Sequence, residues 1–302
     1  MYRKIGIIGV GVVGTAVGVV LNDRGYEITG IFDINPESTK RLEPRARMVA
    51  TSAQEVSRRA DILFITTNDS SIGPVVEELT ANGAFHTGQV VVHMSGAQSS
   101  EYLDDAKNFG AKVLSVHPLQ SFADIEGAIE NMPGSTFSIE GDKEAYDIAV
   151  DIVETLSGEY FFIDRWAKPL YHAGACVVSN YLVTLIDLGV KLLESTGMPK
   201  SMATKALLPL IRGTVHNVEK IGIPKALTGP IARGDVATII KHLDSLAEAT
   251  PDLMTLYSWL GFYTTKIAEE KGTLNQEQGT KLQDVFAEVL SKTVYSEANG
   301  YR

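Results

Sequence analysis

The sequence predicts an α/β fold with a doubly wound, mostly parallel sheet, followed by an all-helical C-terminal domain. Short apolar runs alternate with amphipathic stretches up to about residue 163. Such alternation is typical of buried parallel strands covered by helices on both faces. A glycine-rich turn follows the first apolar run, and beyond about residue 165 the apolar spacing is helical. These three observations together define the fold class.

The individual elements follow from the same patterns. Strands are predicted at 4–10, 27–33, 61–67, 89–95, 112–118, 136–141 and 160–164, with Pro118 ending the fifth strand because proline cannot donate a ladder hydrogen bond. Helices are predicted at 12–23, 71–80, 142–156, 168–196, 200–220, 235–247, 252–270 and 275–293. Pro169 near the start and Gly197 past the end favour one long helix over 168–196. Residues 1–164 then form the α/β domain and residues 165–302 the helical domain.

Composition narrows the class of protein. The 302-residue chain has a net charge of −10 and a pI near 5.1, which argues against nucleic acid or an anionic membrane as partner. A single cysteine, Cys176, excludes an internal disulfide framework, and a cytoplasmic location is expected. Four of the six histidines show no metal-ligand spacing, so no metal site is expected; they are His86, His93, His216 and His242.

The glycine-rich turn has the form G-x-G-x-x-G, with glycines at 9, 11 and 14. It follows a predicted strand and begins a predicted helix, as the dinucleotide-binding fingerprint requires. The first helical residues, Val12 and Val13, would offer free N–H groups to a phosphate. We therefore expect a nicotinamide dinucleotide at this loop. The apolar stretch 5–21 could pass for a signal-peptide core, but this loop explains its five glycines better.

The second predicted strand ends at Asp33. A carboxylate there can bind the ribose hydroxyls and repel a 2′-phosphate, which slightly favours NAD over NADP. A capping role before Pro36 is the alternative. Three downstream arginines could reach a phosphate and keep NADP open; they are Arg41, Arg45 and Arg47.

Ligands bind outside the carboxyl ends of the strands in an open parallel sheet. The third strand is followed by Thr66, Thr67 and Asn68, although helix capping explains Asn68 equally well. Ser95 and Gly96 follow the fourth strand and would leave room for a flat ring. His117, Gln120 and Ser121 follow the fifth strand. The residues after the third and fourth strands are expected to contact the cofactor; they are Thr66, Thr67, Asn68, Ser95 and Gly96. Gln120 and Ser121 are expected to contact the substrate.

The long helix supplies further candidates. His172 and Ser179 are seven residues apart and share a helix face, with Lys168 near them and Asn180 at the edge. Arg233, in a Gly/Pro-rich segment, could bind a substrate carboxylate or form a surface ion pair. We expect His117 and His172 to flank the reacting carbon from opposite domains, with His117 as the group whose protonation matters. Lys168 and Ser95 are the next candidate acids.

Several segments together resemble a bacterial family in which a Rossmann-like domain precedes a helical domain of unknown function, DUF2520. They are "GVGVVG", "MSGAQSSEYL", "SVHPLQSF", "KPLYHAGACVVSNYLVTL" and "LTGPIARGD". The family looks related to the 6-phosphogluconate-dehydrogenase-like reductases, and some members resemble alternative ketopantoate reductases. The resemblance implies nicotinamide binding, a substrate cleft between the domains and a homodimer through the helical domain. Related enzymes place a catalytic lysine in a Lys-x-x-x-Asn pattern, whereas His172 follows Lys168 here.

The leading hypothesis is an NAD(P)-dependent oxidoreductase that reduces a small 2-oxo acid or related carbonyl. The alternatives are an imine or deazaflavin-linked reductase, or a protein that senses nicotinamide nucleotides without turnover. The helical residues after 200 carry apolar side chains that suit pairing of two chains, or alternatively the core of the domain itself; they include Trp259, Leu260, Phe262 and Tyr263.

Overall fold

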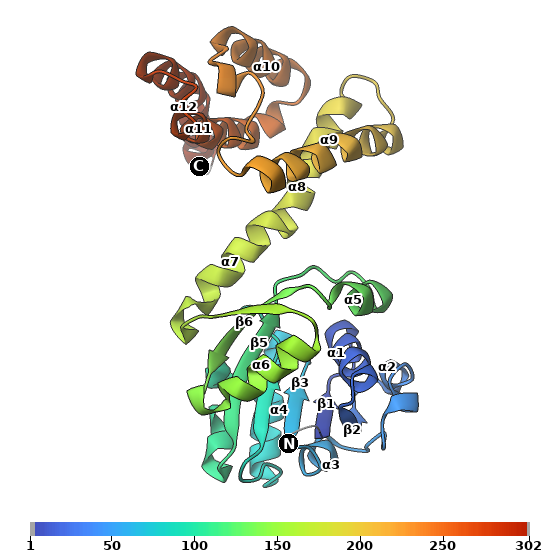
Figure 1. Cartoon of the computed structure of the whole chain (residues 1–302). Coiled ribbons are helices and arrows are strands. Elements are labelled where there is room, and N and C mark those ends of the chain that lie inside the picture. Colours follow the sequence, from blue (N-terminus) through green and yellow to red (C-terminus); the bar gives the residue numbers. More distant parts are fainter. Residues whose placement is uncertain (1–3, 301–302) are drawn as a thin grey trace. The chain divides into compact units, whose positions relative to one another are not determined.

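A seven-stranded sheet forms the centre of the first half of the chain (Figure 1). The computed structural model describes residues 4–300. The strand order is β2-β1-β3-β4-β5-β6-β7, and every neighbouring pair is parallel except β5 with β6. The strands are β1 Lys4–Ile8, β2 Glu27–Phe32, β3 Ile62–Ile65, β4 Val90–His93, β5 Lys112–Pro118, β6 Thr136–Gly141 and β7 Glu159–Phe162. All seven predicted strands are confirmed, and β5 ends at Pro118 as expected.

Helices cover both faces of this sheet. The core on one face contains side chains of α1, α5 and α6, and the core on the other contains side chains of α3, α4 and the 3₁₀ helix η2. These helices are α1 Val12–Asp23, α2 Pro36–Thr39, α3 Ala53–Ser57, α4 Asp69–Ala81, η2 Ser100–Phe109, α5 Ile125–Asn131 and α6 Tyr146–Thr155. Apolar residues of β1, β3, β4 and β5 are shared between the two cores, which gives the doubly wound architecture that the apolar runs predicted.

Polar side chains interrupt the apolar pattern near the carboxyl ends of three strands. His93 in β4 lies opposite Ser115 in β5, which lies opposite Glu140 in β6. His117 lies opposite Ser138 one step further along β5 and β6. Four of these five side chains are buried, and His117 is partly buried. Buried polar groups must be hydrogen-bonded, so this face needs polar partners from the element that covers it.

That element begins with α7 Lys168–Val178, which supplies Lys168 and Tyr171 to the polar face. The predicted helix over 168–196 is divided at Ser179, a turn residue whose φ of −109° and ψ of −73° are distorted but stay in the right-handed helical region. Two β-branched valines and a serine meet at this point, and all three are poor helix formers. The chain divides into compact units at Met1–Asn180 and Tyr181–Arg302, so α7 belongs with the sheet rather than with the helical half.

The second unit is all-helical, as predicted. Its core is built by α10, α11 and α12, where Phe286 packs directly on Gly261. The helices are α8 Asn180–Glu194, α9 Lys200–Ile221, α10 Val236–Ala249, α11 Met254–Glu270 and α12 Gln276–Gly300.

The stretch Arg165–Glu194 is long and apolar enough to cross a membrane by length and composition alone, and 11% of it is buried in the single chain. The sequence analysis did not identify this stretch. Helices that are covered by protein pass the same test, and Lys168 at its start is fully buried against the sheet.

Candidate functional site

The glycine loop between β1 and α1 is shaped by Gly9 and Gly14. Gly9 has φ +89°, which favours glycine, and a Cβ atom there would lie 2.6 Å from the Thr67 nitrogen. A Cβ atom on Gly14 would lie 2.2 Å from the Gly9 carbonyl oxygen. These two glycines give the tight turn and the close helix packing that the fingerprint requires.

Gly11 has a different environment. It is exposed, and no atom of the chain lies within 4 Å of the position that its Cβ would occupy. Gly11 is also the N-cap of α1, whose first turn contains Val12 and Val13 and no acidic residue. Open space in front of a helix N-terminus fits the pyrophosphate of a dinucleotide, because the helix dipole and free N–H groups attract anions.

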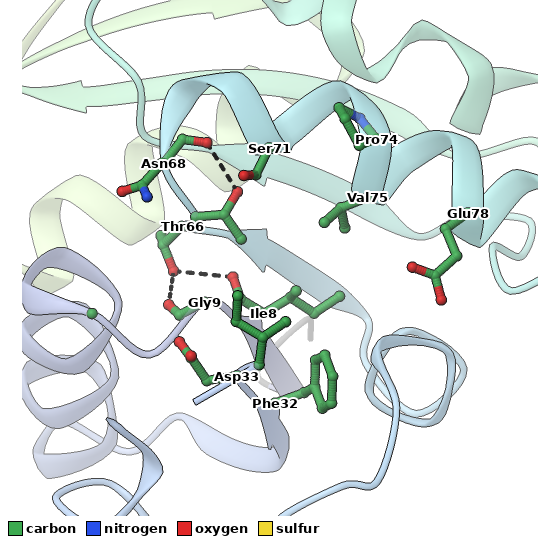
Figure 2. A pocket seen from close by; sticks show the side chains of 13 residues that line it. Ile8, Gly9, Phe32, Asp33, Thr66, Asn68, Ser71, Pro74, Val75 and Glu78 are labelled. Atoms are coloured by element: carbon green, nitrogen blue, oxygen red, sulfur yellow. Dashed lines mark hydrogen bonds between the residues drawn. The ribbon is translucent and has the colours of Figure 1, made fainter. Parts of the chain in front are cut away.

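A pocket of about 350 Å³ continues from this loop across the ends of β1, β2 and β3 (Figure 2). Thr66 donates a 2.7 Å hydrogen bond to the Gly9 carbonyl and so joins the end of β3 to the loop. The lining residues are Ile8, Gly9, Gly11, Phe32, Asp33, Ile34, Thr66, Thr67, Asn68, Ser71, Pro74, Val75 and Glu78. The residues on α4 were missed, although Ser71, Val75 and Glu78 have the spacing of one helix face.

Asp33 connects the end of β2 to the glycine loop. Its two carboxylate oxygens accept hydrogen bonds from the backbone N–H groups of Val10, at 2.7 Å, and Asn35, at 2.8 Å. Asn35, not Asp33, caps the following helix α2. Asp33 therefore positions the loop and also places a carboxylate in the pocket where a ribose would bind.

The three arginines that kept NADP open do not line this pocket. Each pairs with a surface carboxylate: Arg41 with Glu126, Arg45 with Asp23 and Arg47 with Glu27. Among residues 4–300, the charged side chains that line the pocket are Asp33 and Glu78, both acidic.

A second polar cluster lies where β4 and β5 end, beside α7. Gly96 is its centre, because a Cβ atom there would lie 2.6 Å from His172 Nδ1 and 2.7 Å from His117 Nε2. The rings of His117 and His172 are 6.3 Å apart between centroids and nearly perpendicular. The structure thus brings Gly96 and the two predicted histidines together, and the missing side chain at Gly96 allows both rings to reach the loop after β4.

Tyr171 binds the other side of the His117 ring. Its hydroxyl oxygen lies 2.7 Å from His117 Nδ1, and the two rings meet edge to face. Burial, followed by the positive charge of Lys168, lowers the pKa of the His117 imidazole to about 3. His117 is therefore neutral near pH 7. This does not favour the expectation that its own protonation governs the reaction, although a neutral imidazole still donates one N–H.

Lys168 lies beneath this cluster and is fully buried. Its ammonium group donates to the Ser95 carbonyl at 2.7 Å and to the Ser115 hydroxyl at 2.9 Å. Burial lowers the pKa of Lys168 to about 8, while the buried carboxylate of Glu140 opposes the shift. Lys168 therefore fixes the loop after β4, and its burial separates it from any group in solvent.

The depressed pKa of Lys168 predicts a pH-dependent stability. Unfolded lysine titrates near 10.5 and the buried one near 8, so between these values the unfolded chain binds more protons. The contribution of Lys168 to the free energy of unfolding should rise through this window, by at most about 1.4 kcal/mol per pH unit. Urea unfolding of wild type and Lys168→Met across the window measures it. Equal slopes for the two proteins would contradict the prediction.

His172 has one partner and one free nitrogen. The Cys176 sulfur lies 3.5 Å from Nε2, one helical turn further along α7. Nδ1 is buried and has no hydrogen-bond partner within the described part of the chain. A buried ring nitrogen without a partner is rare in proteins, so this atom of His172 is a candidate for a functional contact.

Further buried groups hold the loop after β4. His93 accepts from the Ser95 N–H at 3.2 Å and donates from Nε2 to the Ser99 carbonyl at 3.0 Å, since burial lowers its pKa to about 3 and keeps it neutral. The Ser95 hydroxyl accepts from the backbone at Ala97 and Gln98, so it caps the turn. Glu140 accepts from both the N–H and the hydroxyl of Ser100.

The predicted substrate residues lie apart from this cluster or at its margin. Gln120 and Ser121 are exposed after β5, and the Gln120 amide oxygen accepts from the Ser121 N–H. Ser179 and Asn180 lie at the break between α7 and α8. Arg233 lies in the second unit, so its part in the site stays a prediction.

Comparisons with known proteins agree with this fold and glycine loop. Residues 2–118 match the model of a Rossmann-like domain, and residues 135–264 match the domain of unknown function DUF2520. The fold is that of NAD(P)-dependent oxidoreductases. More narrowly, the two matches give the order of a Rossmann-like domain followed by a DUF2520 domain. No curated protein matches the chain.

Solved structures show the same architecture over most of the chain. A proposed NADP oxidoreductase from Bacteroides fragilis is 23% identical, with a TM-score of 0.70 over 88% of this chain and 98% of that one. A protein from Thermotoga maritima is 25% identical, with a TM-score of 0.69 over 88% and 99%. An imine reductase from a Pseudomonas species is 16% identical, with a TM-score of 0.63 over 94% and 99%.

Proposed function

We propose that the protein is an NAD(P)-dependent reductase of a small carbonyl compound, such as a 2-oxo acid, acting at the cluster around Gly96. The proposal rests on two features that lie in the same compact unit. Free space in front of Gly11 can hold the pyrophosphate, and the cluster of His117, Gly96 and His172 lies where β4 and β5 end. In open α/β sheets, a dinucleotide extends along these strand ends. The nicotinamide would then lie beside Gly96.

The bound dihydronicotinamide supplies a hydride to the carbonyl carbon and is oxidised, while the carbonyl oxygen gains negative charge. The chain's own task is to bind and neutralise that oxygen. Neutral His117 can donate one N–H, and the unpaired His172 Nδ1 faces the same glycine. Lys168 holds the Ser95 carbonyl and Tyr171 holds His117, so the donors are fixed before the substrate binds. The proton that completes the alcohol then comes from solvent.

A panel of 2-oxo acids, aldehydes and cyclic imines with NADH and NADPH tests this function. Turnover is measured as the loss of the absorbance of reduced nicotinamide. Carbonyl turnover supports the proposal. Turnover of imines alone would favour an imine reductase. Cofactor binding without turnover of any compound would favour a nucleotide-sensing protein.

We also propose that NADH binds more tightly than NADPH. The similar Bacteroides protein is described with NADP, whereas the pocket of this chain presents Asp33 and Glu78 to the ribose side. A 2′-phosphate beside these carboxylates would be repelled. Fluorescence titrations should give a lower Kd for NADH, and Asp33→Asn should narrow the difference by about tenfold, or about 1.4 kcal/mol. Glu78→Gln is the control variant, because it removes the other carboxylate that lines the pocket and leaves Asp33 in place. Tighter NADPH binding by wild type would contradict the preference.

A homodimer through the helical unit is our third proposal. Trp259 and Tyr263 on α11 are 46% and 58% exposed, although Phe262 packs on the unit's own core. Leu210 and Val215 on α9 are also exposed. Apolar surface of this extent marks interaction sites. Light scattering should give twice the chain mass, and Trp259→Glu should lower it. A single-chain mass over a wide concentration range would contradict the dimer.

A further inference from the structure

The two histidines at Gly96 each have a second partner on α7. Tyr171 contacts His117 at Nδ1, and Cys176 contacts His172 at Nε2. The opposite nitrogens, His117 Nε2 and His172 Nδ1, are the two that face Gly96. In each ring, therefore, the nitrogen away from Gly96 is paired within the chain and the nitrogen toward Gly96 is left for a ligand.

The chemistry of the partners decides which nitrogen carries the proton. A neutral imidazole has one donor nitrogen and one acceptor nitrogen. The acceptor nitrogen is more basic than a phenol oxygen or a thiol sulfur, so in such a pair the phenol or thiol donates the hydrogen bond. Burial raises the pKa of Tyr171, so its hydroxyl keeps its proton. The Tyr171 hydroxyl and the Cys176 thiol then donate, and the ring protons are placed on His117 Nε2 and His172 Nδ1.

We propose that Tyr171 and Cys176 are positioning residues that orient the His117 and His172 rings, so that each ring directs an N–H toward the loop after β4. This pair of N–H groups then selects a substrate that offers an oxygen acceptor. The proposal rests on the proposed function and deepens it. An oxygen that gains negative charge is stabilised by two such donors. A protonated imine nitrogen is itself a donor and finds no acceptor in this pair.

The charged groups near the cluster include Lys168, Glu140 and Arg165, which donates to the Ser100 hydroxyl at 3.0 Å. The Lys168 ammonium lies 5.7 Å from the centre of the Tyr171 ring and donates to Ser95 and Ser115. The Glu140 carboxylate accepts hydrogen bonds from the N–H and the hydroxyl of Ser100, and Glu140 pairs with Ser115 across β5 and β6. Among the described residues, none of these groups is hydrogen-bonded to His117 or His172, so the imidazoles set the hydrogen-bond character of the surroundings of Gly96.

Nitrogen-15 NMR of the full chain with labelled histidine tests the tautomers without any substrate. His93 serves as an internal standard, because its backbone partners require Nε2–H. We expect His117 as the Nε2–H form and His172 as the Nδ1–H form. Tyr171→Phe should convert His117 to a mixture and leave His172 unchanged, and Cys176→Ala should do the reverse.

The chain offers a matched control. His242 Nδ1 and the Tyr257 hydroxyl lie 2.8 Å apart in the helical unit, with rings that also meet edge to face. Tyr257→Phe should therefore alter His242 alone and leave the turnover unchanged. A wild-type His117 in the Nδ1–H form, or a His172 in the Nε2–H form, would overturn the proposal.

Binding of small probes separates this proposal from the proposed function. With NADH present, pyruvate should shift the Nε2 signal of His117 and the Nδ1 signal of His172, and 1-pyrroline should not. Tyr171→Phe should lower kcat for an active 2-oxo acid by at least about tenfold with KM little changed. Preferred binding of 1-pyrroline would overturn the selectivity but leave a reductase. Correct tautomers without turnover of any compound would leave the positioning roles intact and refute the reductase.

Discussion

Gly11→Val should abolish binding of NADH and NADPH while the protein folds like wild type. The position of the new side chain is empty in the chain, so the valine meets no protein atom, and it would occupy the place of the pyrophosphate in front of α1. Fluorescence titration measures the binding, and thermal unfolding without cofactor measures the fold. Cofactor binding at wild-type strength by a folded Gly11→Val protein would show that the dinucleotide binds elsewhere.

Gly14→Ala is the informative comparison for this variant. Its Cβ would collide with the Gly9 carbonyl and with the Thr66 hydroxyl, at 2.2 and 2.4 Å. Binding should be lost here together with stability, because the loop itself must move. The contrast between the two variants separates a ligand-facing glycine from a packing glycine within the same motif.

His117→Ala should lower turnover by at least about a hundredfold once a substrate is known, with cofactor affinity nearly intact. The alanine removes the N–H that faces Gly96, whereas the glycine loop and the pocket at Asp33 lie at other strands. Steady-state kinetics and a cofactor titration on the same preparation give both quantities. His86→Ala is a control, because that histidine lies before β4 and contacts backbone carbonyls only.

The pH dependence of this step should also differ from that of an ordinary histidine acid. The pKa of His117 is about 3, so its protonation state does not change near pH 7. The rate should therefore show no inflection near 6.5, the pKa of unperturbed histidine. Near-normal turnover in both His117→Ala and His172→Ala would assign these histidines to structure alone.

The sequence predicted the backbone of this fold well and its side-chain contacts less well. Apolar runs located all seven strands, and the glycine pattern located the dinucleotide loop. His117 at the end of a strand and His172 early in the helix after the last strand were expected to meet from opposite domains, whereas both lie in the first compact unit. Strand ends and helix starts depend on local pattern, which the sequence contains.

The missed residues depend on how α7 is rotated against the sheet. Tyr171 and Cys176 share a helix with His172, but only the packed structure shows that one contacts His117 and the other His172. Glu140 and Ser115 were hidden in apparently ordinary strands, since a polar residue in a strand signals a buried network only when its cross-strand neighbours are known. The break at Ser179 was missed because the apolar spacing continues across it.

The attachment of α7 to the sheet has a consequence for how such proteins can be recombined. Lys168 donates hydrogen bonds to Ser95 in the loop after β4 and to Ser115 in β5, yet in the sequence it lies beyond the last strand of the sheet. A chimera joined after residue 164 would pair the β4 and β5 ends of one parent with the lysine, tyrosine and histidine of another. A crossover after Asn180 keeps these coadapted side chains in one parental segment. The segment that must come from a single parent to keep this cluster intact is therefore longer than the α/β domain predicted from the sequence.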